Sequence, residues 1–421
     1  MRRISPSNQN NNIRAVEKIT LDEKVASKKR IFFIVLFVCL GVGAFIYGFT
    51  HLGNNKKGWQ RVVIEKYEYE NCSYDFSFEY CFGTTKLGVN KEREQVIDLY
   101  KQLTTKAYRL FDRDQSYEGL VNVNDINLHV NTELTLDPML YEALKSFEDH
   151  GTREIYVCAL AEHYDALIQI DTLEALSEVD PYTSKEVADF FKKVAAFASD
   201  EQAVSMEFLP DYRMILHVSD EYLAYAAEHD IRSFIDFGWM RNAFLADYIA
   251  EGMIAKGYTK GILSSYDGFI RNFSDTGDGY DFPLYLRNGN TVYPALTLSY
   301  EGEHAIVWLR DYPVETFDEF RFLSLPDGSI RNCYVNMEDG LGKAAAHDFV
   351  LWSKNGCCRD ILFAAMPYYL SENKLADDTA DKILQQNIYT LLSEDFTVRM
   401  NDSSMRIKTL YEEDGIAFSV K

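Results

Sequence analysis

An uninterrupted apolar run near the N-terminus constrains this chain more than any other feature. Residues 31–49 read IFFIVLFVCLGVGAFIYGF and contain no charged residue and no proline. A transmembrane helix needs about 20 apolar residues to cross about 30 Å of hydrocarbon, and this run just reaches that length. A buried helix of a soluble domain is the alternative, but such a helix does not need apolar residues on every face. The sequence therefore predicts a single membrane anchor.

The charges around this run predict which side of the membrane each part occupies. Residues 1–30 carry eight Lys and Arg against three acidic residues, and Lys28, Lys29 and Arg30 abut the run. Excess positive charge keeps a flanking segment in the cytoplasm. We therefore predict a single-pass protein of the cell membrane with four parts: a basic cytoplasmic tail (1–30), a transmembrane helix (31–49), a polar stalk that turns into a strand (50–75) and an extracytoplasmic domain (76–421).

The part of the chain beyond the basic tail is strongly acidic. The formal charge of the whole sequence is −22 and residues 1–30 contribute +5, so the remainder carries −27. A surface this negative repels nucleic acid, and we expect no nucleic-acid partner. A phosphate-bearing ligand would need a cation bound with it. Six of the seven cysteines lie outside the apolar run, and Cys72 and Cys81 are candidates to pair across a turn.

Hydrophobic periodicity predicts strands and helices that are intermixed without a strict β-α-β rhythm, so we predict an α+β fold. Residues 76–89 predict a strand broken at Gly83, and residues 91–112 have helical spacing. Further along, the pattern predicts a strand from 231 to the turn at Gly238, a helix after it, short strands over 282–353 with a turn at Asn288–Gly289, and helices over 359–370 and 376–393.

Several short segments carry a more specific signal because of their order. They are Phe82-Gly83-Thr84 after a strand, Leu110-Phe111-Asp112 followed by Ser116, Leu120 and Asn124, residues 236–247 (DFGWMRNAFLAD), Asp267-Gly268-Phe269, Asp327-Gly328 with residues 333–340 (CYVNMEDG), and residues 359–364 (RDILFA). Each block alone is weak. Taken in this order over residues 76–370, they make the chain resemble the FAD:protein FMN transferases, the ApbE-type flavin transferases.

This resemblance implies an ApbE-like mixed strand and helix domain, FAD as substrate, Mg²⁺ as metal and an exported flavoprotein as acceptor. Cleaving a pyrophosphate requires positive charge to balance the charge that develops on its oxygens. The resemblance implies Asp360 and the main-chain carbonyl of Arg241 as ligands of Mg²⁺. The implied flavin-binding positions are Gly83, Thr84, Asn124, Gly238, Asn242 and Asp247. No catalytic residue is assigned.

Several matched positions depart from the family's pattern where the chemistry is done. Asn242 stands where the family has a lysine, which removes a positive charge beside the phosphates. Ala364 stands where a threonine helps to hold the metal. The remaining departures are Trp239 and Ala243 for two glycines, and Cys333, Asn336 and Asp339 for a histidine, an aspartate and a threonine. The kept positions serve mainly backbone shape.

Three functions are therefore left open. The substitutions favour a degenerate, membrane-anchored ApbE-like protein that takes part in flavin binding or in flavinylation of an exported electron-carrier protein. The first alternative is an active Mg²⁺-dependent FAD:protein FMN transferase. The second is a cell-surface interaction domain that has no connection with flavin.

Overall fold

The computed structural model describes residues 56–64, 70–275, 277–314, 318, 321–402, 405–413 and 415–421. The chain divides into two compact units, Met1–Lys56 and Lys57–Lys421, and we describe the second. The predicted basic tail (1–30) and membrane anchor (31–49) lie outside the described residues. Within the described ranges no helix combines the length and the apolar character needed to cross a bilayer.

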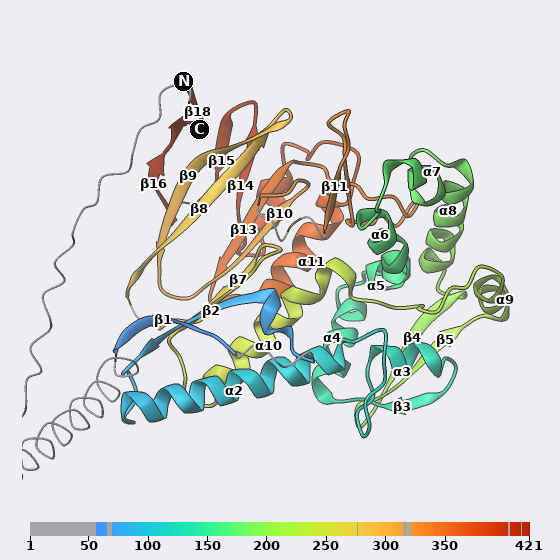
Figure 1. Cartoon of the computed structure of the whole chain (residues 1–421), viewed down its shortest axis with the longest axis horizontal. Coiled ribbons are helices and arrows are strands. Elements are labelled where there is room, and N and C mark those ends of the chain that lie inside the picture. The colour runs from blue at the N-terminus through green and yellow to red at the C-terminus, as the bar shows by residue number, and fades with distance from the viewer. Residues whose placement is uncertain are drawn as a thin grey trace, which may run out of the picture. The chain divides into compact units, whose positions relative to one another are not determined.

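A sheet of nine strands runs through the described part of the unit (Figure 1). Neighbouring strands are antiparallel, except for the parallel pair at one edge. The first strand lies within the segment predicted as a stalk, so part of residues 50–75 belongs to the sheet. In spatial order the strands are β1 (Gly58–Val62), β2 (Phe76–Phe82), β6 (Gly261–Ser265), β7 (Phe269–Asn272), β10 (His304–Arg310), β13 (Asp348–Lys354), β14 (Tyr389–Glu394), β15 (Thr397–Met400) and β19 (Ser419–Val420).

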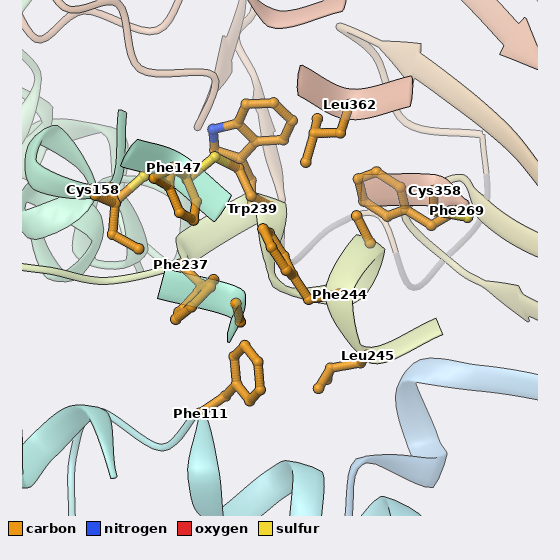
Figure 2. Close-up of a cluster of buried hydrophobic side chains, with 14 of the residues drawn as sticks. Phe111, Phe147, Cys158, Phe237, Trp239, Phe244, Leu245, Phe269, Cys358 and Leu362 are labelled. Atoms are coloured by element: carbon orange, nitrogen blue, oxygen red, sulfur yellow. The ribbon is translucent and has the colours of Figure 1, made fainter. Parts of the chain in front are cut away.

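Helices cover one face of this sheet. Helices α10 (Arg241–Ala255) and α11 (Cys358–Tyr369) contact its central strands, and α2 (Val89–Leu110) packs on α10. The core on this side is rich in aromatic rings (Figure 2). The ring of Phe237 lies 4.5 Å from that of Phe111 and 5.1 Å from that of Phe244, measured between centroids. Contacts of this kind stabilise beyond the area that they bury.

A smaller sheet covers the opposite face. It consists of β8 (Gly279–Asn288), β9 (Thr291–Glu301) and β16 (Arg406–Leu410). Strand β10 contributes to two hydrophobic cores, one on each face of the main sheet. Ile306 and Trp308 belong to the core beneath the smaller sheet, whereas the residues that alternate with them belong to the core beneath the helices. Every residue of β10 is buried, as expected for a strand that is covered on both faces.

Most of the remaining elements lie between β2 and α10 in the sequence, and α3 to α9 among them form the group of helices on the right of Figure 1. The α-helices are α3 (Val123–Leu128), α4 (Pro138–Asp149), α5 (Glu154–Val157), α6 (Ala161–Ile168), α7 (Leu176–Val179), α8 (Lys185–Ser199), α9 (Asp220–Glu228) and, near the C-terminus, α12 (Thr379–Leu384). The 3₁₀ helices are η1 (Cys72–Asp75), η2 (Cys158–Leu160), η3 (Leu173–Ala175) and η4 (Gly238–Met240). The short strands are β3 (Glu133–Thr135), β4 (Val204–Leu209), β5 (Arg213–Val218), β11 (Phe322–Ser324), β12 (Ile330–Asn332), β17 (Glu412–Glu413) and β18 (Ile416–Ala417).

The predicted α+β class is confirmed, as are the helix that became α2 and the hairpin turn at Asn288–Gly289. The helix predicted over 376–393 is wrong in its second half: α12 ends at Leu384, Asn387 adopts a left-handed conformation with φ of 59°, and β14 follows. The proposed pairing of Cys72 with Cys81 is also wrong, since both thiols are free.

The segment 231–237, predicted as a strand, is irregular, and residues 233–237 of it are buried. Hydrogen bonds from the side chain of Asn127 replace those that a neighbouring strand would make with this segment. Its Oδ1 accepts from the backbone N–H of Phe234 (2.9 Å) and Ile235 (3.1 Å), and its Nδ2 donates to the carbonyl of Ile235 (3.0 Å). The apolar pattern was thus a sign of burial rather than of a strand.

Gly268, in the turn between β6 and β7, is a position where the backbone tolerates no side chain. Its φ is +98°, and a Cβ atom there would lie 2.3 Å from the carbonyl oxygen of Trp308. Gly268→Ala is therefore expected to lower the free energy of unfolding by about 2–3 kcal/mol, because strain and a clash act together. Urea unfolding of the full-length protein measures this loss. Gly279→Ala is the control, since nothing lies within 4 Å of its Cβ position, and an equal loss there would contradict the explanation.

Candidate functional site

A cavity of about 540 Å³ lies where the helical group meets the sheet. This size is within the usual range of small-molecule sites. The wall combines aromatic rings with charged groups, which is the composition expected of a site that holds a polar aromatic ligand. The lining residues are Tyr74, Asp75, Tyr108, Phe111, Asp112, Arg113, Asp114, Cys158, Ala161, Tyr164, Asp165, Ile168, Asp236, Gly238, Trp239, Arg241, Asn242, Tyr266, Asp267, Arg321, Cys333 and Val335.

The turn that leads into α10 brings several of these side chains together. Asp236 and Gly238 line the cavity, whereas Phe237 between them packs into the aromatic core (Figure 2). Gly238 has φ of +49°, and a Cβ atom there would approach the sulfur of Cys158 to 3.3 Å. The glycine thus allows a tight turn against α10 and the 3₁₀ helix η2. Trp239 lines the cavity but is 8% exposed, and its ring meets Tyr334 edge-on.

Arg113 connects two parts of the cavity wall. Its Nη1 donates to Asp236 Oδ2 at 2.6 Å, and its Nη2 donates to Asp165 Oδ2 on α6. Asp236 is buried and also accepts from the backbone N–H of Gly238 at 3.1 Å. Two charge-assisted bonds on one guanidinium fix both carboxylates in place. The cation of Arg113 is therefore already occupied by protein anions.

A second arginine of the wall is paired in the same way. Arg241 Nη2 donates to Asp75 Oδ2 at 2.9 Å. Burial raises the pKa of Asp75, and the guanidinium of Arg241 opposes this effect. Among the described lining residues there are six aspartates and three arginines and no lysine, which gives the wall a formal charge of −3.

Asn242 and Asp267 form the polar pair at the start of α10. The amide Nδ2 of Asn242 donates to Asp267 Oδ2 at 2.9 Å. Asn242 Oδ1 and Asp267 Oδ1 are buried acceptors without a hydrogen-bond partner, and Arg321 Nη1 is a buried donor without one. Unsatisfied buried atoms of this kind in a cavity wall indicate where a ligand or water would bind. The cavity thus presents acceptors and a donor in addition to its aromatic rings.

Known structures with the same arrangement of elements were found by comparison. The ApbE protein of Thermotoga maritima superposes with a TM-score of 0.51 at 12% identity, covering 79% of this chain and 94% of that chain. The flavin transferase ApbE of Vibrio cholerae gives a TM-score of 0.50 at 11% identity, covering 76% and 90%. The chain has an ApbE-like fold. No protein-family model and no curated protein sequence matches the chain.

Three of the predicted site residues of the ApbE-like domain line the cavity. These are Gly238, Arg241 and Asn242. Arg241 was predicted to act through its main-chain carbonyl, but it is the first residue of α10, where a carbonyl normally accepts the helical hydrogen bond from the next turn. Its side chain, paired with Asp75, is what faces the cavity.

Gly83, Thr84 and Asn124 were predicted as flavin-binding positions but are not among the residues that line the cavity. The first two form a turn around the buried carboxylate of Glu92. Gly83 N donates to Glu92 Oε2 at 2.6 Å, and Thr84 Oγ1 donates to Glu92 Oε1 at 3.4 Å. Asn124 does not line the cavity but forms hydrogen bonds with the segment that carries Arg113. With its amide oriented to satisfy both atoms, it donates to the carbonyl of Arg113 at 3.0 Å and accepts from Ser116.

Asp247, on α10, and Asp360, in the first turn of α11, are not among the lining residues of the cavity. Asp247 is buried, and its two oxygens accept from the backbone N–H of Cys358 (2.9 Å) and Arg359 (2.8 Å). It thus caps α11 from α10. The side chain of Asp360 is 56% exposed and is paired with the neighbouring Arg359 at 3.3 Å.

This arrangement does not fit a magnesium ion held by Asp360 and the Arg241 carbonyl. Mg²⁺ requires oxygen ligands in near-octahedral geometry. The oxygens of Asp247 are occupied by backbone N–H groups, Asp360 faces a guanidinium, and Ala364 supplies no ligand atom. Within the described ranges, no group of three or more His, Cys, Asp or Glu side chains is arranged to hold a metal.

Arg113, Asp165 and Arg321 belong to the cavity wall but were not predicted from the sequence. The partners of Arg113 lie 52 and 123 residues away along the chain. No spacing rule joins residues so far apart. Asp267 had a usable signal, since it precedes the glycine of a predicted turn in a block that matched the family.

The pKa of Asp247 is raised by burial to about 6 from an ordinary value of 3.8, with its backbone hydrogen bonds opposing the shift. The folded state therefore holds this proton more tightly than the unfolded state does, so the stability that protonation contributes is present below about pH 4 and is lost as pH rises to about 6. Asp247→Asn is expected to remove this dependence. The free-energy difference between the native protein and the variant should change by about 2–3 kcal/mol over that range.

Urea unfolding of both proteins between pH 4 and pH 7 measures this change. Asp171→Asn serves as control, because Asp171 is exposed and lies outside the cavity wall. A difference between Asp247→Asn and the native protein that stays constant with pH would contradict the assignment of the proton to Asp247.

Proposed function

We propose that the chain is an ApbE-like protein that binds a flavin in the cavity and does not transfer FMN from FAD. The observation that carries this proposal is the pair formed by Asn242 and Asp267. An amide occupies the position where the resembling family has a lysine, and it donates to a carboxylate that adds negative charge to the cavity. A transferase needs the opposite charge at this place, since the pyrophosphate becomes more negative as it breaks.

Two further features support the loss of transfer. The two cavity arginines Arg113 and Arg241 are already paired with aspartates, so neither guanidinium is available to bind a phosphate. The predicted metal ligands Asp360 and Arg241 do not form an oxygen site. Flavin binding is supported by the fold, by the size of the cavity and by the partly exposed rings of Tyr74, Tyr108 and Tyr266 in its wall.

The membrane anchor and the partner are part of the same proposal and rest on the sequence. The apolar run 31–49 with its basic flank would place the domain outside the cytoplasm. There it would bind flavin for, or take part in the flavinylation of, an exported electron-carrier protein. Protease accessibility in intact cells tests the orientation: cleavage of the domain from outside is expected, and protection from outside would contradict it.

The function is tested by incubating the purified full-length protein with FAD, Mg²⁺ and a flavoprotein domain that carries an acceptor threonine. We expect no release of AMP and no covalent flavin on the acceptor. In separate titrations with riboflavin, FMN and FAD, we expect at least one flavin to bind, with quenching of its fluorescence. The Vibrio cholerae flavin transferase is the positive control. AMP release together with a flavinylated acceptor would favour the active transferase, and the absence of any flavin binding would favour the interaction domain.

A further inference from the structure

The charge of the cavity wall limits which flavin it accepts. Asp75, Asp112, Asp114, Asp165, Asp236 and Asp267 outnumber Arg113, Arg241 and Arg321, giving the formal charge of −3 among the described lining residues. FMN and FAD add further negative charge through their phosphates, whereas riboflavin is uncharged near neutral pH. Repulsion in a partly dehydrated cavity is stronger than in water. The wall therefore opposes the phosphorylated flavins.

The arginines do not offset this repulsion. Arg113 is bound to Asp236 at 2.6 Å and to Asp165, and Arg241 is bound to Asp75 at 2.9 Å. Arg321 Nη1 makes no hydrogen bond, but it lies 3.7 Å from the carboxylate of Asp318, which offsets its charge. A phosphate would have to displace a carboxylate from a guanidinium to gain a comparable bond. Removing one partner of a buried pair leaves the other charge unpaired, which is costly.

The unsatisfied atoms of the wall match an uncharged ring. Asn242 Oδ1 and Asp267 Oδ1 are buried acceptors that require a donor, and phosphate at neutral pH supplies almost none. The imide edge of a flavin ring carries an N–H between two carbonyls, and the sugar-like chain carries hydroxyls. The N–H or a hydroxyl would satisfy the acceptors, and a ring carbonyl would accept from Arg321 Nη1.

We propose that the cavity selects a flavin without phosphate groups, of the riboflavin class, over FMN and FAD. This inference rests on the proposed function. Asp267 and Asn242 would recognise donors on the ring or its side chain, Arg321 would recognise a ring carbonyl, and the carboxylates Asp112, Asp114 and Asp165 would repel phosphates at the rim.

Fluorescence titrations of the full-length protein with riboflavin, FMN and FAD, in the presence of EDTA, test the inference. The dissociation constant for riboflavin should be at least roughly tenfold lower than that for FMN or FAD. The gap should narrow at high salt, because salt screens the repulsion of phosphates more than it affects an uncharged ligand. FMN or FAD binding as tightly as riboflavin would overturn the inference and leave flavin binding intact. Binding of none of the three would overturn the proposed function and with it this inference.

Asp165→Asn isolates the charge effect. The side chain of Asp165 is 49% exposed, and its loss frees Nη2 of Arg113 while removing one negative charge. The variant should bind FMN roughly tenfold more tightly, with little change for riboflavin. Asp281→Asn makes the same change in net charge on an exposed residue of β8, in the small sheet on the other face of the main sheet, and should leave both affinities unchanged. An equal effect of the two substitutions, or no effect of Asp165→Asn on FMN, would overturn the role given to the cavity charge.

Discussion

Replacing Arg113 with methionine is expected to lower the free energy of unfolding by about 3–5 kcal/mol. The side chain of Arg113 is 18% exposed, and that of its partner Asp236 is 7% exposed. Methionine keeps much of the aliphatic volume but leaves the Asp236 carboxylate buried with only the N–H of Gly238 as a partner. A buried carboxylate that loses its counter-charge is among the larger single-residue losses of stability. Urea unfolding at neutral pH measures the effect.

Arg109→Met is the matched control for this prediction. Arg109 lies in the last turn of α2, four residues before Arg113, and pairs with Glu70 at 2.7 Å, but both side chains are 43% exposed. An exposed pair of this kind contributes about 1 kcal/mol or less. Similar losses for the two variants would show that burial of the Arg113 network is not what stabilises the cavity wall.

The parts of the fold that the sequence predicted are those set by local rules. The amphipathic spacing of residues 89–110 and the Asn288–Gly289 turn each depend on a few neighbouring residues, and both are present. The segment 231–237 was wrongly predicted as a strand because a buried irregular segment has the same apolar pattern as a buried strand. Its hydrogen-bond partner Asn127 lies 104 or more residues earlier in the sequence, so no local pattern could reveal it. Local sequence patterns therefore predict which residues are buried, but they do not predict which residues those contact.

The candidate site divides along the same line. Gly238, Arg241 and Asn242 were located because one continuous block of sequence carries them into the cavity. Asp247 was assigned to flavin from the same block, but one and a half turns further along α10 it faces α11 and caps that helix. The pairing of Arg113 with Asp165 and Asp236 could not be predicted, since the fold alone brings those residues together.

The largest expected change in ligand binding comes from restoring positive charge to the cavity. Asn242→Lys places an ammonium group beside Asp267, and Asp165→Asn releases part of Arg113. A unit charge at about 12 Å from a phosphate is worth about 1.4 kcal/mol at an effective dielectric constant of about 20, which is roughly tenfold in affinity. The two sites share no hydrogen bond, so their effects should nearly add. The double variant is expected to bind FMN roughly a hundredfold more tightly.

The same variant separates binding from catalysis. Its FMN affinity is measured by fluorescence titration, and Asn242→Met with Asp165→Asn is the control that matches the size of lysine without its charge. We expect the double variant to release no AMP from FAD and Mg²⁺, because Ala364 still supplies no ligand atom and the oxygens of Asp247 still cap α11. An equal gain for the methionine control would mean that space, not charge, keeps phosphates out. AMP release would mean that the missing lysine alone had prevented the cavity from acting as a transferase.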